Sequence, residues 1–357
     1  MIKHLYIHVP FCKTICSYCD FCHVIYNEDL VNKWLVRFKE EIKECGNEQY
    51  ETIYIGGGTP TSLSDDNLEE LLKLVRPHTN NVQEYTIEIN PETLSSSKAD
   101  ILVKYGINRV SIGLQSSSNE LLKLLNRNHT FQDVKRCVEL LRQKGISDIS
   151  LDIMYSLPNQ TMDDLKNTIN DVLGLNVPHL SLYSLTIEEN TIFGKKGYKS
   201  LDEEIEADMY EYIVNTLTDN GYIQYEVANF SKPGYESKHN IGYWHYEDFR
   251  GLSCGSSSKI ANLRYDKVRS INKYLNSKDI IETEYPLEKE DMMFENIMMS
   301  LRLKEGLDIE EFNRKYNTNL TEIYKKGINN PNIEIYDNHL ICTNREILNS
   351  VLVDFME

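Results

Sequence analysis

Several features that mark other protein classes are missing from this chain of 357 residues. No stretch approaches the roughly 20 consecutive apolar residues that a membrane-spanning helix needs. The opening residues run too briefly for a secretory leader, and there is no internal repeat and no low-complexity tract. We therefore expect a cytoplasmic protein, which would reach a membrane only peripherally, through its partners.

Basic residues are also scarce. Lys and Arg number 38 against 55 Asp and Glu, which gives a formal net charge of −17. An acidic surface repels phosphate backbones and anionic lipid, so nucleic acid is excluded as a general partner. Apolar content is ordinary at 41%, and the length suits one large domain with a smaller one.

Short β-branched runs alternate with amphipathic segments through the first half of the chain. Six such units joined by short turns predict a parallel sheet in an α/β protein. The runs read as near-continuous apolar segments, which predicts strands buried on both faces. The predicted strands are Leu5–Val9, Thr52–Ile55, Tyr85–Ile89, Arg109–Leu114, Ile149–Ile153 and Leu180–Ser184, and the predicted helices include Val31–Glu44, Asp66–Val75, Phe131–Lys144 and Met162–Leu173.

The pattern changes after about residue 230. A break at Ser231-Lys-Pro-Gly-Tyr opens a segment that we predict to be a connector, 231–285. Residues 286–357 contain helical segments, then a short strand-like pair and a last helix. Helices followed by a β-ribbon predict a small α+β, winged-helix-like domain after a large domain at 1–230.

Four of the eight cysteines lie within residues 12–22. In a reduced compartment, clustered cysteines are more often metal ligands than disulfides. Cys12, Cys16 and Cys19 have the spacing Cys-x-x-x-Cys-x-x-Cys, which suits a 4Fe–4S cluster with one iron left open. A structural zinc site that uses Cys22 as its fourth ligand is the alternative. An open iron could chelate the amine and carboxylate of S-adenosylmethionine.

A glycine run, Gly56-Gly-Gly-Thr-Pro-Thr, follows the second predicted strand. Glycines let a backbone approach a ligand closely, and we expect their N–H groups to take a carboxylate or a ribose.

Together these motifs resemble the radical S-adenosylmethionine family, in the branch that contains oxygen-independent coproporphyrinogen III oxidases and heme chaperones. The resemblance covers nearly the whole chain. It implies an open six-stranded (β/α)6 partial TIM barrel, a 4Fe–4S cluster and S-adenosylmethionine. The matching stretches are Leu5-Tyr-Ile-His-Val-Pro-Phe-Cys, the glycine run, Thr86-Ile-Glu-Ile-Asn-Pro-Glu, Ser111-Ile-Gly-Leu-Gln-Ser, Asn126-Arg-Asn-His-Thr and Leu151-Asp-Ile-Met-Tyr-Ser-Leu-Pro-Asn-Gln-Thr.

The resemblance also implies residue roles. Cys12, Cys16 and Cys19 would ligate the cluster. The residues implied for S-adenosylmethionine are Tyr6, Tyr18, Gly57, Gly58, Thr59, Glu88, Gln115, Arg127 and Asp152. We expect His8, His23 and His129 to be packing or solvent residues.

Within that branch, the sequence favours the chaperones. The first strand begins too near the start for the segment that closes over the oxidase substrate, and Phe21 stands where the oxidases have a further cysteine. His239-Asn-Ile-Gly-Tyr-Trp resembles the chaperones' heme motif, with His239 as an axial ligand and the rings of Tyr243 and Trp244 for stacking. A packed loop is the alternative. Candidate partners for the heme propionates are Lys238, Arg250 and Arg264.

Two cysteines depart from the family pattern. Cys22 is expected to be free or protective. Cys254 stands in a stretch where the chaperones carry other residues, and it is either a small buried residue or a thiolate ligand.

The leading hypothesis is a protein that binds 4Fe–4S, S-adenosylmethionine and heme and delivers heme to respiratory proteins. The alternative is a radical enzyme acting on a porphyrin, either a coproporphyrinogen oxidase or a related heme-modifying or methyl-transferring enzyme. The sequence identifies no electron donor and leaves the oligomeric state open, with a dimer among the options.

Overall fold

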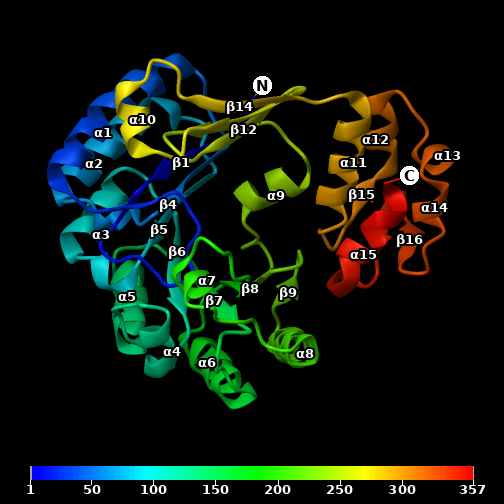
Figure 1. Ribbon diagram of the computed structural model, residues 1–357, viewed down its shortest axis with the longest axis horizontal. Helices are drawn as coiled ribbons and strands as arrows, with labels where there is room; N and C mark the ends of the chain where they lie inside the picture. Colours follow the sequence, from blue (N-terminus) through cyan, green and yellow to red (C-terminus); the bar gives the residue numbers. More distant parts are fainter. Residues whose placement is uncertain (1, 357) are drawn as a thin grey trace.

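Six parallel strands run in chain order through the first half of the computed structural model, which describes residues 2–356 (Figure 1). Their neighbours pair in the same order as they follow in the chain, so each crossover passes over one face of the sheet. The six strand–helix units that the sequence predicts are confirmed. The strands are β1 (His4–Val9), β4 (Thr52–Gly57), β5 (Glu84–Ile89), β6 (Arg109–Gln115), β7 (Asp148–Tyr155) and β8 (His179–Ser184).

The crossover helices begin where the sequence supplies capping side chains. The Ser64 hydroxyl accepts from Asn67 N, and the Ser95 hydroxyl accepts from Lys98 N. Gly145, with φ 88°, follows the C-cap of the fifth helix, as predicted for a left-handed residue. The helices are α1 (Glu28–Glu41), α2 (Asp65–Val75), α3 (Ser96–Lys104), α4 (Asn119–Leu124), α5 (Phe131–Gln143), α6 (Met162–Leu175), α7 (Ile192–Lys195) and α8 (Glu203–Asp219).

The barrel strands are buried on both faces, as predicted, but the two faces differ in polarity. On β7, Leu151 and Ile153 are fully buried in the main hydrophobic core. The alternate residues Ser150 and Asp152 line an interior cavity. Successive side chains of a strand point to opposite faces, so the barrel has an apolar outer layer under the helices and a polar interior.

The sheet continues beyond the six strands at both ends. Strand β11 (Phe249–Leu252) pairs parallel to β1, and a meander follows it. The segment predicted to be a connector therefore contains four strands of the sheet. The remaining elements of the sheet and its loops are β12 (Ser257–Ile260), β13 (Leu263–Lys267), β14 (Ile281–Pro286), β10 (Asn229–Ser231), β9 (Ile223–Gln224), α10 (Ile271–Asn276) and a separate pair, β2 (Phe11–Cys12) with β3 (Val24–Ile25).

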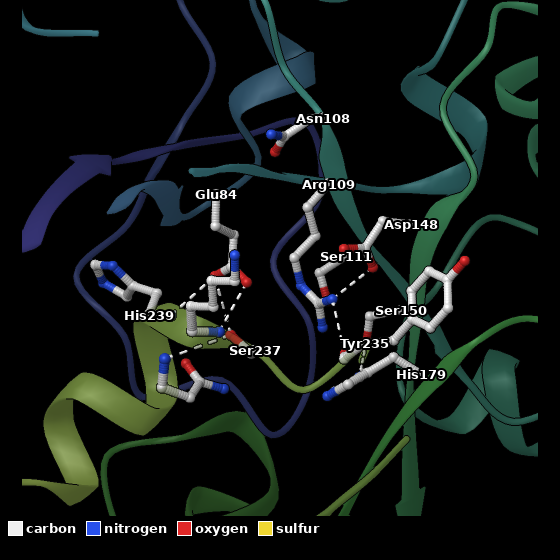
Figure 2. Close-up of polar contacts among 12 residues, drawn as sticks. Glu84, Asn108, Arg109, Ser111, Asp148, Ser150, His179, Tyr235, Ser237 and His239 are labelled. Carbon is white, nitrogen blue, oxygen red and sulfur yellow. Dashed lines mark hydrogen bonds and ion pairs between the residues drawn. The ribbon is translucent and has the colours of Figure 1, made fainter. Parts of the chain in front are cut away.

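Helix α9 (Lys238–Trp244) lies in the open side of the curved sheet, between the sheet and the carboxy-terminal elements (Figure 1). The buried Glu84 carboxylate, at the start of β5, accepts from Ser237 Oγ, Lys238 N and His239 N (Figure 2). A carboxylate at a helix amino terminus satisfies free N–H groups and the helix dipole. These bonds fix α9 to the barrel.

The carboxy-terminal elements form a second hydrophobic core of their own. A helix, a strand, further helices and a two-stranded wing give a three-stranded sheet in the order β15-β17-β16, which agrees with the winged-helix-like prediction. The elements are α11 (Lys289–Ser300), β15 (Leu307–Asp308), α12 (Ile309–Tyr316), α13 (Leu320–Ile323), α14 (Lys325–Ile328), β16 (Ile333–Tyr336), β17 (His339–Cys342) and α15 (Leu348–Leu352). Among residues 2–356, none of the helices combines the length and apolar character that a bilayer crossing requires.

Candidate functional site

The loop that carries the cysteines is held in place by the segments that follow β6. Asn126 Nδ2 donates to the carbonyl of Ile15 at 2.7 Å, and Asn128 Nδ2 donates to Thr14 Oγ1 at 2.7 Å. Ser17 N donates to Leu125 O at 3.0 Å. The loop is therefore bound to the carboxyl-terminal end of the barrel, where the active sites of TIM-type barrels form.

Cys12, Cys16 and Cys19 line one wall of a cavity of about 470 Å³ inside the barrel. Burial raises the pKa of the Cys12 thiol to about 12 and that of Cys19 to about 11. The thiols therefore stay protonated until a cation such as iron displaces the protons. In the part of the chain that the structure describes, no three His, Cys, Asp or Glu side chains are grouped to hold a single metal ion. A 4Fe–4S cube needs its three thiolates on three different irons, and so further apart.

Cys22 does not join this wall. Its Sγ donates to the carbonyl of Arg269 at 2.8 Å and lines a different cavity. The zinc alternative needed Cys22 as its fourth ligand and does not fit this geometry. The three remaining cysteines and the space beside them fit a cluster with an open iron.

Arg127 lies beside the cysteines. Its guanidinium contacts Cys16 Sγ at 3.6 Å and donates to Asn90 Oδ1 at 3.0 Å and to Gly113 O. Its Nε is buried without a hydrogen-bond partner. A buried cation at this place offsets the negative charge that three thiolates bring.

Two carboxyl groups face the same cavity from β5 and β7. Glu88 accepts from Tyr54 OH at 2.8 Å and from Gly57 N at 3.0 Å, and burial followed by repulsion from Asp152 raises its pKa to about 7. Burial also raises the pKa of Asp152 to about 6, although Ser111 Oγ donates to it at 2.9 Å. Carboxyl groups whose charge is this costly favour a cationic ligand such as an ammonium or a sulfonium.

The glycine run packs differently from the expectation. Gly57 N donates to Glu88, Gly58 N to Val9 O at 2.8 Å, and Thr59 N to Phe11 O at 2.8 Å. A Cβ at Gly58 would lie 2.8 Å from Phe11 O. The three N–H groups are thus used within the chain, and the glycines allow close contact between β4 and the cysteine loop. All three residues still line the cavity.

The other predicted residues divide between two cavities. Gln115 has φ 65° at an irregularity that ends β6, and with Tyr18 it lines the cysteine cavity. Tyr6 does not. It lines an adjoining cavity of about 760 Å³, which shares Tyr54 and Glu88 with the first.

The adjoining cavity is rich in aromatic rings. Tyr243 of α9 packs edge-on against Phe249 with ring centres 4.6 Å apart, and both line it with Tyr6 and Tyr54. The ring of His239 lines it as well, but both nitrogens are engaged, Nδ1 with Thr52 Oγ1 at 2.7 Å and Nε2 with Tyr243 OH at 2.8 Å.

The rest of the predicted heme motif is placed elsewhere. Trp244 does not line this cavity; its indole lies under the guanidinium of Arg302, 4.6 Å from ring centre to Cζ. Arg250 is paired with Glu48, and Arg264 with Glu295. The arginine that does line the cavity is Arg269, which sequence reasoning missed.

His8 and His129 are buried, as expected of packing residues, whereas His23 lines the cysteine cavity with its Nδ1 3.6 Å from Cys19 Sγ. His129 Nε2 bonds to Leu114 O at 3.0 Å, and burial lowers its pKa to about 4. His8 bonds to Cys22 O, and His23 to Phe21 O.

Sequence reasoning also missed Tyr54, Asn90 and Asn240 of the cavity walls. The alternation of polar and apolar residues along the strands could have found Tyr54, because it shares its face of β4 with Thr52 and Gly56.

Comparisons with known proteins agree with this architecture. Residues 6–172 match the model of the Radical SAM superfamily, and residues 287–346 match that of the HemN C-terminal domain. Among solved structures, coproporphyrinogen III oxidase (HemN) from Escherichia coli superposes with a TM-score of 0.86 at 19% identity, covering 99% of this chain and 90% of that one. That likeness concerns the fold.

Curated relatives are more similar in sequence. A protein of Lactococcus lactis named heme chaperone HemW is 37% identical, over 96% of this chain and 91% of the relative. Proteins of the same name from Bacillus subtilis and Escherichia coli are each 36% identical, over 90% and 86% of this chain and 89% and 84% of the relatives.

Proposed function

Because the chain belongs to the radical SAM superfamily and, within it, to the family of the HemW heme chaperones, we propose that it takes up heme and passes it to other proteins. A 4Fe–4S cluster and S-adenosylmethionine are the cofactors that the superfamily implies. The observation that carries the proposal is a pair of adjoining cavities, one lined by three cysteines and one by aromatic rings, which share Tyr54 and Glu88.

In this proposal Cys12, Cys16 and Cys19 hold the cluster, and Arg127 balances its charge. The bound cluster supplies an iron with an open coordination position for the amine and carboxylate of S-adenosylmethionine.

The chain's own residues would do the rest of the binding. Glu88 and Asp152 attract the positive charge of the ligand, and each loses its proton more readily once that charge is present. Tyr18 offers a ring to the adenine, and Gln115 an amide. Gly57, Gly58 and Thr59 close the wall behind the ligand.

Heme would occupy the aromatic cavity, whose volume of about 760 Å³ lies within the range of cofactor pockets. Tyr6, Tyr243 and Phe249 would contact the macrocycle, and Arg269 a propionate. His239 could ligate the iron only by giving up one of its two present partners, Thr52 or Tyr243. The Tyr243 hydroxyl would then compete with the heme iron for the His239 imidazole, which would favour the release of heme.

The test is a heme titration of the full chain, reconstituted anaerobically with its cluster. We expect heme to shift the Soret band of the parent chain. The affinity obtained from the titration should be at least tenfold lower in His239→Ala, which corresponds to about 1.4 kcal/mol of lost binding energy. His78→Ala is the control, because His78 is equally buried and lines neither cavity. A shift that is absent, or the same in both variants, contradicts the proposal.

Delivery is tested by mixing the heme-loaded chain with a heme-free acceptor. The recipients that we propose are membrane-bound respiratory hemoproteins, approached from the cytoplasm. Heme that stays on the chain at equimolar acceptor would contradict a delivery role. Light scattering of the same samples measures whether the chain is a dimer.

A second candidate, radical chemistry on a porphyrin, is favoured by the shared wall of the two cavities, because it would place a bound macrocycle beside S-adenosylmethionine. With reductant and S-adenosylmethionine, a porphyrin product of altered mass would establish it.

A further inference from the structure

Cys22 and Cys254 lie side by side, although they are far apart in the sequence and neither belongs to the cluster ligands. Cys22 ends the cysteine loop, and Cys254 is in the turn between β11 and β12. A Cβ placed on Gly255 would lie 2.4 Å from Cys22 Cβ and 3.0 Å from Cys22 Sγ, so Cys22 rests on the backbone next to Cys254. The two thiols are also close enough to interact: a hydrogen bond between them lowers the pKa of Cys22 and raises that of Cys254.

The turn that carries Cys254 is held rigidly. Ser253 has φ 77°, and its N–H donates to both carboxylate oxygens of the buried Glu41 at 3.1 Å. Trp34 Nε1 donates to Ser253 Oγ at 2.8 Å. Lys267 and Tyr274 bind Glu41 in turn. Cys254 therefore has a fixed position, which lowers the entropy cost of joining it to a neighbour.

The two thiols differ in access. Cys254 is fully buried, whereas Cys22 is 9% exposed and lines the aromatic cavity. A small reagent that enters that cavity reaches Cys22 first. This arrangement gives one attacking thiol and one resolving thiol, the pattern of a redox pair.

We propose that Cys22 and Cys254 form a reversible disulfide that ties the cluster-binding loop to the β11–β12 turn. The oxidant is a small-molecule disulfide, RSSR. The Cys22 thiolate attacks one of its sulfurs, forming a mixed disulfide and releasing RS⁻. The Cys254 sulfur then attacks the Cys22 sulfur and releases the second RS⁻. Cys22 and Cys254 lose two electrons and two protons in total, and RSSR becomes two RSH.

Formation of this bond would leave the cluster cysteines untouched while fixing the loop three residues beyond Cys19. It would also place a disulfide in the wall of the aromatic cavity in place of a thiol. The inference does not depend on heme binding, because it rests on the two thiols and the turn alone.

The experiment uses the full chain with its cluster in place, held in glutathione buffers of graded oxidised fraction. Samples are quenched with an alkylating reagent, digested without reduction and measured by mass spectrometry. We expect one linked peptide pair, Cys22 with Cys254, to increase with the oxidised fraction and to disappear on reduction, while iron content stays constant. Cys45, Cys137 and Cys342 should be recovered without a link, since each is buried out of reach of the oxidant.

Variants separate the two roles. In Cys254→Ala, we expect glutathione to stay attached to Cys22 as a mixed disulfide, whereas in Cys22→Ala Cys254 should stay reduced. Cys342→Ala is the matched control for a buried cysteine elsewhere and should behave as the parent. The proposal is overturned if the parent chain, which needs no substitution to fold, gives no Cys22–Cys254 link at full oxidation, or if Cys22 links to Cys19 instead.

Discussion

Glu88 is the side chain on which the proposed binding of S-adenosylmethionine depends most directly. Its pKa of about 7 means that it is half protonated near neutral pH and fully charged only above it. Since the ligand brings positive charge, its affinity should rise as pH increases through about 7.

We predict that Glu88→Gln weakens S-adenosylmethionine binding by roughly 10- to 100-fold, because hydrogen bonds to a charged group contribute about 1.5–3 kcal/mol. The variant should also lose the rise in affinity with pH. Calorimetric titration of the cluster-loaded chain between pH 6 and 8 (about one unit on each side of that pKa) measures both. Glu120→Gln, an exposed position in the first turn of α4 that lines neither cavity, is the control. An unchanged pH profile in Glu88→Gln would refute the assignment.

Asp152 makes a prediction about stability. In the ligand-free fold its pKa is about 6, against an ordinary value of 3.8. Between these values the unfolded chain has released the proton and the folded chain still holds it, so the free energy of unfolding falls as pH rises through this window. Asp152→Asn should remove that slope and raise the free energy of unfolding at pH 7 by on the order of 1–3 kcal/mol.

Urea unfolding of the ligand-free chain at several pH values measures this effect. Asp171→Asn, on the exposed face of α6, should leave both the slope and the midpoint unchanged. A destabilised Asp152→Asn variant would mean that the bond from Ser111 outweighs the cost of the buried charge.

Some residues of the candidate site could be predicted from the sequence, and others could not. Glu88, Arg127 and Asp152 were predicted from motifs, and all three line the cysteine cavity. The placement of Tyr6 in the other cavity was beyond prediction, because that cavity is formed where β1 pairs with β11, a strand from a distant part of the chain. The paired state of Arg250 likewise depends on Glu48, which no local pattern connects to it.

At the scale of elements, α9 reaches both cavities, because Asn240 lines the two of them along with Tyr54 and Glu88. Its seven residues are too few for a stable isolated helix. It is formed because the Glu84 carboxylate holds its first turn against the barrel (Figure 2).

We predict that Glu84→Gln loosens α9 and destabilises the chain by about 1–3 kcal/mol, since three donors lose a charged acceptor. Hydrogen exchange at residues 238–244 should become faster, and heme affinity should fall while S-adenosylmethionine affinity changes little. Glu139→Gln, exposed on α5, is the control. If α9 stays protected from exchange in Glu84→Gln, other contacts hold it.

The strands of the barrel could be predicted, and those of the extension could not. β1, β4 and β5 carry Leu, Ile, Val or Tyr at every second position, so pattern alone identifies them. β12 and β13 are polar and short, and β11 contains a glycine. They become strands because β1 offers a free edge to pair with, which is a tertiary effect.

At the scale of the whole molecule, the two hydrophobic cores meet across α9. Ser300 Oγ donates to Trp244 O at 3.2 Å, and Arg302 covers the indole of Trp244. Tyr246 OH donates to Glu295 at 2.5 Å. The domain boundaries at residues 230 and 285 stay a prediction, which unfolding experiments can test.

We predict two overlapping thermal transitions in the ligand-free chain, of which the smaller comes from the carboxy-terminal core. Trp244→Ala should separate them by several degrees, because it removes a cation–π contact of about 0.5–2 kcal/mol together with buried indole surface. Differential scanning calorimetry measures the separation. Tyr336→Ala, on the exposed wing, should not change it. One transition that shifts as a unit in both variants would show a single cooperative domain.

The sheet of twelve strands never meets itself, because β14 stands at one end of its order and β9 at the other. A closed barrel can be entered only at its two ends, whereas this open sheet also has a free side, which the short helix α9 covers. Passage of a broad, flat molecule through this side would require the release of the three bonds from Glu84 to the start of that helix, but not the rupture of any ladder between neighbouring strands.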